Sequence, residues 1–218
     1  MEYNQIIELK RNIIAATWSI PQEDILQIWA EKASGWAWLH DKSQRYYSNQ
    51  SNLLMYPSII INTVAGGIGF LNTPASIVFL PYIIAIFNII VAILISFQKF
   101  LRSTENAELH ARYFSIFSSF TRKISLELTL KPDDRINCIQ FCKMCKTEYD
   151  TAVSESPIIP DCIIKQFKKE FPNEKNKPEI ANGLFHFTVY KRNKSDNNLS
   201  ESPKSNNSNN SDIILNID

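Results

Sequence analysis

The feature that most constrains this chain is a long stretch without charge: no Asp, Glu, Lys or Arg occurs between Arg45 and Lys99. Charged residues make up 21% of the sequence, so a soluble stretch of this length would hold about ten of them. A helix of a soluble domain also has to turn a polar face to water. The mean hydropathy of −0.17 is typical of a soluble protein, but it averages the uncharged stretch with polar flanks. The sequence therefore predicts membrane-spanning segments.

Two apolar runs in this stretch are long enough to cross a bilayer. They cover residues 53–71 (LLMYPSIIINTVAGGIGFL) and 77–97 (IVFLPYIIAIFNIIVAILISF), and the short link 72–76 separates them. A helix needs about 20 apolar residues to cross a hydrocarbon core of ~30 Å, and a short, turn-rich link makes two helices antiparallel neighbours. We expect an all-α membrane protein with an antiparallel two-span helical hairpin, long helical cytosolic extensions and a disordered C-terminal tail. The alternative is a helical hairpin buried in a soluble bundle, but the remaining chain is too polar to cover both helices.

The flanking charges predict the orientation of the hairpin. Lys42 and Arg45 precede the first run and Lys99 and Arg102 follow the second, whereas the link carries no charge. Because basic residues stay on the cytosolic side, both termini are expected to be cytosolic. The net charge of +1 gives no basic excess, so we expect no nucleic-acid partner.

Polar residues inside the two runs lie at matching depths. Asn62 lies nine residues after the start of the first run, and Asn88 lies nine residues before the end of the second. An amide in hydrocarbon needs a hydrogen-bonding partner, and Asn62, Thr63 and Asn88 are therefore candidates for a contact between the two helices. The alternative is a polar lining of a pore, or a seam between copies of the chain.

Outside the runs, two helical segments are expected to continue the hairpin and to pack together. Apolar residues recur at helical spacing within 21–52 and again within 109–128. His40 lies 13 residues before the first run and His110 lies 13 residues after the second, so both stand at the same height. The alternative to simple packing is a site that binds a metal ion or senses pH. The candidate packing residues at this level are Trp38, His40, Tyr47, Glu108, His110 and Tyr113.

The rest of the chain is expected to be cytosolic and polar. We divide the sequence into an N-terminal segment (1–20), the hairpin domain (21–150), a C-terminal segment (151–192) and a Ser/Asn-rich disordered tail (193–218). A third cytosolic helix is expected over 134–149.

The predicted third helix contains three cysteines with the spacing that radical S-adenosylmethionine enzymes use for an iron–sulfur cluster. These are Cys138, Cys142 and Cys145, and only 73 polar, loop-rich residues follow them. Such enzymes need a large barrel around the cluster, so we interpret the cysteines as small hydrophobic residues on a buried helix face. We predict no enzyme, no catalytic residue, no metal site and no cofactor.

Three sets of strings in the sequence are informative together. They are Trp38-Leu39-His40-Asp41-Lys42-Ser43 with Tyr47, Pro57, Thr63 and Gly66; Asn88-Ile89, Phe100-Leu101, Glu105, Glu108 and His110; and Glu148-Tyr149-Asp150, Glu155-Ser156-Pro157, Ile159-Pro160 and Lys177-Pro178-Glu179-Ile180. Together they resemble the two-span membrane proteins of giant nucleocytoplasmic DNA viruses, which also carry Pro, Thr and Gly at the same spacings in the first run. The resemblance covers roughly residues 25–185.

The resemblance implies a non-enzymatic viral integral membrane protein, a self-associating structural or assembly component. Its location would be the inner membrane of the virion or an intracellular membrane of the host. Its partners would be lipid, further copies of the chain and other viral proteins bound through the cytosolic helices. The viral family is in turn similar to SLATT two-span effector domains, which gives the alternative of a pore-forming or membrane-perturbing effector.

Overall fold

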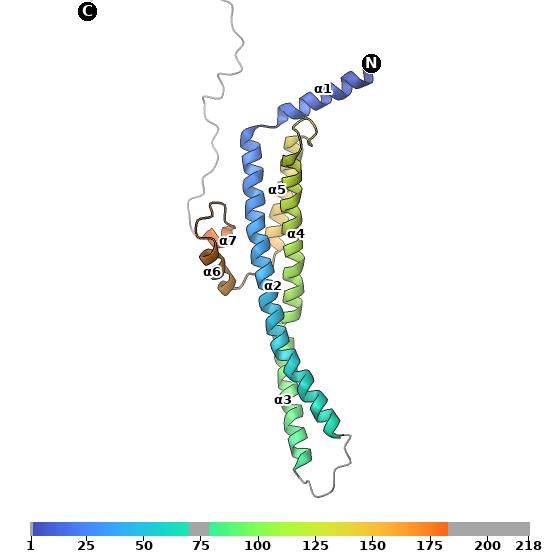
Figure 1. The fold of residues 1–218 in the computed structure, drawn as a ribbon, viewed down its shortest axis with the longest axis vertical. Helices are drawn as coiled ribbons and strands as arrows, with labels where there is room; N and C mark the ends of the chain where they lie inside the picture. Colours follow the sequence, from blue (N-terminus) through green and yellow to red (C-terminus); the bar gives the residue numbers. More distant parts are fainter. Residues whose placement is uncertain (1, 70–78, 183–218) are drawn as a thin grey trace, which may run out of the picture. The chain divides into compact units, whose positions relative to one another are not determined.

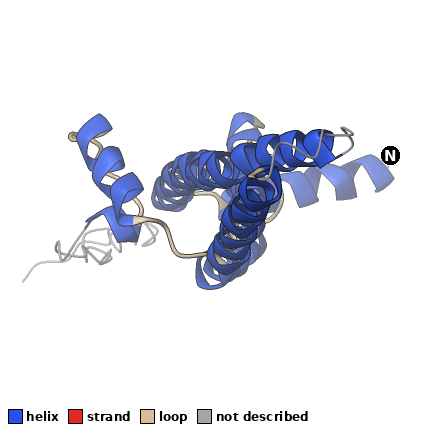
Figure 2. Ribbon diagram, turned by 90° about the horizontal axis from the view of Figure 1, so that it is seen from below, coloured by secondary structure: helices blue, strands red, loops and turns tan. Residues whose placement is uncertain are grey.

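The computed structural model describes residues 2–69 and 79–182, and these residues form helices and loops without a strand (Figure 2). The all-α prediction is therefore confirmed for this part of the chain. The link 72–76 and the tail 193–218 lie outside the described residues. In order, the helices are α1 (Glu2–Thr17), α2 (Ile20–Gly69), α3 (Leu80–Leu101), α4 (Ser103–Thr129), α5 (Cys138–Glu155), α6 (Asp161–Glu170) and α7 (Glu179–Asn182).

Helix α2 is 50 residues long and packs along α4 through its first half and against α3 through its second (Figure 1). Pro57 lies inside α2 without ending it. The inner face of α4 follows the helical repeat, because its buried residues recur every three or four positions. These residues are Ser103, Ala107, His110, Tyr113, Phe117, Phe120, Ile124 and Glu127.

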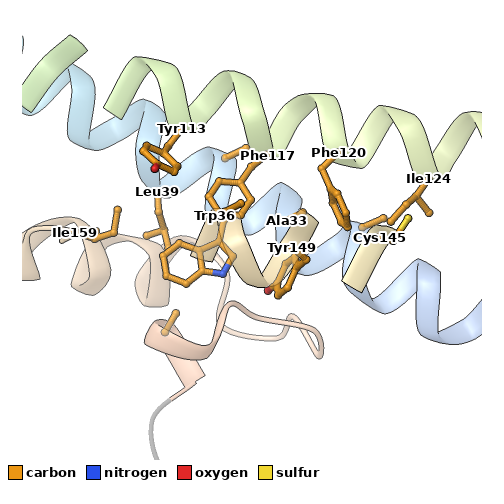
Figure 3. Close-up of a cluster of buried hydrophobic side chains, with 14 of the residues drawn as sticks. Ala33, Trp36, Leu39, Tyr113, Phe117, Phe120, Ile124, Cys145, Tyr149 and Ile159 are labelled. Atoms are coloured by element: carbon orange, nitrogen blue, oxygen red, sulfur yellow. The ribbon is translucent and has the colours of Figure 1, made fainter. Parts of the chain in front are cut away.

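The hydrophobic core lies mainly between α2, α4 and α5, and seven of its eighteen buried residues are aromatic. Trp36 of α2 stacks on Phe117 of α4 with 5.7 Å between the ring centroids, and Phe120 lies 5.7 Å from the ring of Tyr149 on α5. Aromatic pairs at such distances add to the free energy of burial. Figure 3 shows side chains of the three helices meeting in this layer: Ala33, Trp36 and Leu39 from α2; Tyr113, Phe117, Phe120 and Ile124 from α4; and Cys145 and Tyr149 from α5.

A break at Arg102 separates α3 from α4. The backbone of Arg102 has φ 47° and ψ 34°, which is the left-handed region, and it is the one non-glycine residue with a positive φ in the described chain. This conformation costs a non-glycine residue roughly 1–2 kcal/mol. The break falls five residues after the apolar run ends at residue 97, and it divides α3 from the core-forming α4.

Helix α5 begins at Cys138, four residues later than the sequence pattern predicts, and two side chains explain the difference. The side-chain oxygen of Asn137 accepts hydrogen bonds from the backbone nitrogens of Ile139 and Gln140, which makes Asn137 the N-cap. Arg135 is buried and donates to the carbonyl oxygens of Leu128 (2.9 Å) and Leu130 (2.8 Å). It thereby satisfies carbonyls that the end of α4 leaves unpaired.

The N-terminal segment contains a helix that the sequence pattern did not predict, and hydrogen bonds fix its end to the start of α5. The hydroxyl of Thr17 accepts from the backbone nitrogen of Cys138 (3.2 Å). The indole of Trp18 donates to the carbonyl of Ile136 (3.0 Å) and lies under the guanidinium of Arg135 at 4.8 Å. The sequence pattern of the sixteen residues of α1 does not reveal these contacts with residues more than a hundred positions away.

Residues 161–182 fold back on the outer side of α2. Trp38 makes edge-to-face contacts with Phe167 (5.3 Å) and Phe171 (5.5 Å) of this segment. Further along, Gly35 lies so close to Pro178 that a Cβ on Gly35 would stand 2.7 Å from two ring carbons. The rigid ring of Pro178 is packed against α2 and cannot move aside, so position 35 requires glycine.

Replacing Gly35 by alanine is therefore expected to destabilise this packing by about 1–3 kcal/mol, the usual cost of overfilling a packed site. We expect a lower midpoint in thermal unfolding and faster proteolysis between residues 171 and 182. Gly67→Ala is the matched control in the same helix, because nothing lies within 4 Å of a Cβ at Gly67. Equal thermal midpoints for the two variants would contradict the assigned contact.

Candidate functional site

Between Leu53 and Phe97 the described residues expose an apolar surface that we call the apolar belt. Ile60 and Ile89, for example, are each 62% exposed. Monomeric soluble proteins rarely expose continuous apolar surface on this scale. The belt comprises Leu53, Tyr56, Ile59, Ile60 and Val64 before the link and Phe79, Tyr82, Ile83, Ile86, Ile89, Ile90, Ile93, Ile95 and Phe97 after it.

The belt ends where the core begins. Of the 22 residues of α3, Val91 is the buried one, whereas α4 buries a residue in every turn. The stretch Leu80–Thr129, which joins α3 to α4, is long and apolar enough to cross a membrane: its most apolar window has a mean hydropathy of 2.5 and is 6% buried. Among the described residues it is the one helical stretch that is both long enough and apolar enough to cross a membrane. The described part of the first predicted span, 53–69, forms the end of α2.

A pair of buried histidines lies between α2 and α4, just on the core side of the belt. Nδ1 of His40 lies 2.9 Å from Nδ1 of His110, and both side chains are almost completely buried. One nitrogen must donate and the other accept, so the two rings share a single proton at this contact. Nε2 of His40 is buried without a partner among the described residues. Because an unpaired N–H is the rarer and costlier case, we assign the proton to Nδ1 of His40.

Aromatic rings enclose the histidine pair. The ring of His40 stacks on Phe117 (5.5 Å) and lies 5.6 Å from Tyr113, and Tyr47 stacks on His110 (5.4 Å). Burial among these rings, with the neighbouring His110 adding to it, lowers the pKa of His40 to about 3. Burial also lowers the pKa of His110 to about 4. Both imidazoles are therefore neutral at pH 7 and act as packed, hydrogen-bonded core residues.

The six candidate packing residues divide into those that reach this pair and those that do not. His40, Tyr47, His110 and Tyr113 meet in it. Trp38 instead packs against α6 and the segment after it, and Glu108 is exposed. Within the described residues, no group of three or more His, Cys, Asp or Glu side chains is arranged to hold a metal ion.

The three polar residues of the apolar runs do not bond to one another in the described structure. The hydroxyl of Thr63 donates to the carbonyl of Ile59 in its own helix (2.8 Å). Asn62 and Asn88 are exposed, and no hydrogen bond of their side chains occurs within the described residues. Two amides are thus presented on an apolar surface.

Three of the four cysteines lie on one side of α5, and burial suppresses the reactivity of Cys138 and Cys145. The sulfur atoms of Cys138 and Cys142 are 3.8 Å apart, and Cys145 is part of the core. Burial raises the pKa of Cys138 to about 12 and that of Cys145 to about 11. Thiols with such pKa values stay protonated and are poor nucleophiles and poor metal ligands.

A half-buried polar cluster around Glu179 was not predicted from the sequence. Its carboxylate accepts hydrogen bonds from Lys32 (2.7 Å), from the indole of Trp36 (3.3 Å) and from the hydroxyl of Tyr149 (3.2 Å). Burial raises the pKa of Glu179, but the bond from Lys32 and the other donors outweigh it and leave the pKa below its ordinary value. Lys32 and Trp36 lie more than a hundred residues away on α2 and Tyr149 lies 30 residues away on α5, so no local pattern reveals these partners. The cluster joins α2, α5 and α7.

Comparisons with models of protein families, with curated proteins and with solved structures found no match for this chain. We therefore infer function from the apolar belt, from the two amides on it and from the packing of the helices next to it.

Proposed function

We propose that this chain is a non-enzymatic integral membrane protein that crosses the bilayer twice, through 53–71 and 77–97, and associates with further copies of itself. The observation that carries the proposal is the apolar belt, whose isoleucines and aromatic residues face outwards with no core to cover them. Lipid is the solvent in which such a surface is stable. The helices α4 and α5 and the first half of α2 would then form a cytosolic bundle above the membrane.

Extraction of membranes with alkaline carbonate tests the proposal, since it releases peripheral proteins and leaves integral ones behind. We expect the full chain to stay in the membrane pellet and to leave it only with detergent. Recovery of the folded protein in the soluble fraction would overturn the proposal.

Self-association is the second part of the proposal, and the exposed amides support it. An amide facing hydrocarbon is stabilised when it bonds to another chain, and model peptides give about 1–2 kcal/mol for such contacts. Asn62 lies one turn from Gly66, where nothing lies within 4 Å of a Cβ, so a second backbone has room to approach. A second copy presents the same amide and can both donate and accept.

Replacing Asn62 by leucine is expected to weaken association roughly 5- to 30-fold, the equivalent of that bond energy. Chemical cross-linking over a range of protein-to-detergent ratios would measure the shift. Asn49→Leu is the matched control, since Asn49 is exposed on the same helix before the belt begins. Unchanged cross-linking of the Asn62→Leu variant would show that the Asn62 amide does not take part in the interface between copies.

The resemblance to two-span proteins of giant DNA viruses is the reason for placing the chain in a virion inner membrane or a host intracellular membrane. The cytosolic bundle would then be the surface for other viral proteins. Membrane fractionation of purified virions with protein identification tests this location. Consistent absence from the virion fraction would leave a host membrane as the proposed site.

The exposure of Asn62 and Asn88 on the belt also favours a second candidate, a SLATT-like effector that permeabilises membranes. When several hairpins assemble in a ring, polar side chains on their surfaces can line a water-filled pore. This candidate predicts leakage of dye from liposomes that contain the protein, abolished by Asn62→Leu. Intact liposomes at high protein load would exclude it and leave the structural role.

A further inference from the structure

A groove with two basic side chains lies at the junction of α3 and α4, at the edge of the apolar belt. Its volume is about 480 Å³, and it is lined by Ile95, Gln98, Lys99, Arg102, Thr104 and Glu105. Ile95 belongs to the belt, whereas the other lining residues are polar or charged. The groove thus changes from apolar to basic along the direction in which α3 leaves the belt.

The two cations in the groove are available to a ligand. Lys99 forms no ion pair with the described residues. Nε of Arg102 is 3.9 Å from a carboxylate oxygen of Glu105, and both side chains are 73% exposed. An exposed pair at this distance contributes very little. The hydroxyl of Thr104 is already shared with Ser51 (2.8 Å), so the ligand-binding groups are the ammonium and the guanidinium.

We propose that this groove binds the phosphate of an anionic phospholipid headgroup, with one acyl chain running past Ile95. The inference rests on the proposed membrane insertion, which puts the end of the second span, residue 97, at the boundary of hydrocarbon and headgroups. Lys99 and Arg102 then stand at the depth of the lipid phosphates. Arginine and lysine are the side chains that bind phosphate through charge-assisted hydrogen bonds.

Glu105 gives the proposal a test of opposite sign. Its carboxylate opposes a phosphate, so the groove carries two positive charges and one negative. Removing Lys99 and Arg102 should abolish the preference for anionic lipid, whereas removing the charge of Glu105 should strengthen it. A generic electrostatic attraction to the membrane would respond to the total charge alone, so charges removed outside the groove would have the same effect as charges removed within it.

The experiment uses the full chain in lipid nanodiscs of phosphatidylcholine with one part in ten of phosphatidylglycerol. Spin-labelled forms of the two lipids report how strongly each associates with the protein. We expect phosphatidylglycerol to be preferred about fivefold, as one net basic charge near the headgroups provides. Lys99→Gln with Arg102→Gln should remove the preference for phosphatidylglycerol, since only the negative charge of Glu105 remains in the groove, and Glu105→Gln should raise the preference several-fold. Millimolar inorganic phosphate should leave it unchanged, because the lipid is held by its chain as well.

Lys168→Gln with Lys169→Gln is the matched control, since it removes two exposed charges on α6 outside the groove. Loss of the preference in this control, its persistence without Lys99 and Arg102, or equal association of both lipids with the unmodified chain would each overturn the proposal. Competition by free phosphate would identify an anion site that does not depend on lipid and would overturn it as well. Failure of the chain to enter discs of pure phosphatidylcholine would instead contradict the membrane insertion itself.

Discussion

Replacing Ile86 and Ile89 by arginine is expected to move the protein from the carbonate-resistant membrane pellet into the soluble or aggregated fraction. The two side chains are 56% and 62% exposed on α3, so arginines there would not disturb the packing of the folded chain. In a bilayer they would lie near the middle of the second span. Each central arginine costs about 2.5–3.5 kcal/mol in membrane insertion, and the two together reduce insertion by more than about a thousandfold.

The matched control replaces two exposed leucines of α4, Leu109 and Leu126, by arginine. These residues are 39% and 66% exposed, but they lie beyond the belt, where we expect the protein surface to face water. The control protein should stay in the membrane pellet like the unmodified chain. If both double variants divide in the same way between the membrane pellet and the soluble fraction, α3 does not lie in the membrane as proposed.

Acidification is expected to unfold the bundle through the histidine pair. The pKa values of His40 and His110 lie at about 3 and 4 in the folded protein but near 6.5 in the unfolded chain. The unfolded chain therefore binds protons at a higher pH than the folded one. The stabilisation from the neutral pair is complete above pH 6.5 and is lost as the pH falls towards 4.

Each histidine contributes a slope of up to about 1.4 kcal/mol per pH unit in that range, so the expected loss is several kcal/mol. Urea unfolding of the detergent-solubilised chain between pH 7 and pH 4.5, followed by circular dichroism, measures it. The double variant His40→Leu with His110→Leu should show a much flatter dependence.

The single variants test the shared proton. His40→Leu or His110→Leu leaves one buried ring nitrogen without a partner, which costs about 1–3 kcal/mol at pH 7. Removing both rings removes that penalty, so the double variant should lose less stability than the two single variants added together. Simple additivity would contradict the hydrogen bond between the two Nδ1 atoms.

The sequence predicts the level of a residue along the helix axis better than it predicts the rotation of the helix about that axis. Counting residues from the ends of the apolar runs places His40 and His110 at one level, because the rise per residue of a helix is constant. The same count places Glu108 nearby, yet Glu108 is exposed. Which residue faces inwards depends on how two helices turn about their axes, and only the packed structure determines it.

Other features could not be predicted because they depend on contacts between distant segments. Glu179 binds Lys32 and Trp36, which lie far away in the sequence. The break at Arg102 occurs without the glycine or proline that usually marks one. The buried position of Arg135 depends on carbonyls that the end of α4 exposes, so the start of α5 shifts as well.

The central claim is that the chain crosses the membrane twice with its helical bundle on the cytosolic side. Chemical labelling tests it most directly: a cysteine is introduced as Ser76→Cys in the link, and sealed microsomes with the cytosolic face outside are treated with a membrane-impermeant maleimide. Cys162, which is exposed on α6, reports the bundle, and Cys162→Ser removes its signal. We expect Cys162 to react in intact vesicles and Ser76→Cys to react only after detergent is added. Labelling of Ser76→Cys in intact vesicles would contradict the two-span topology.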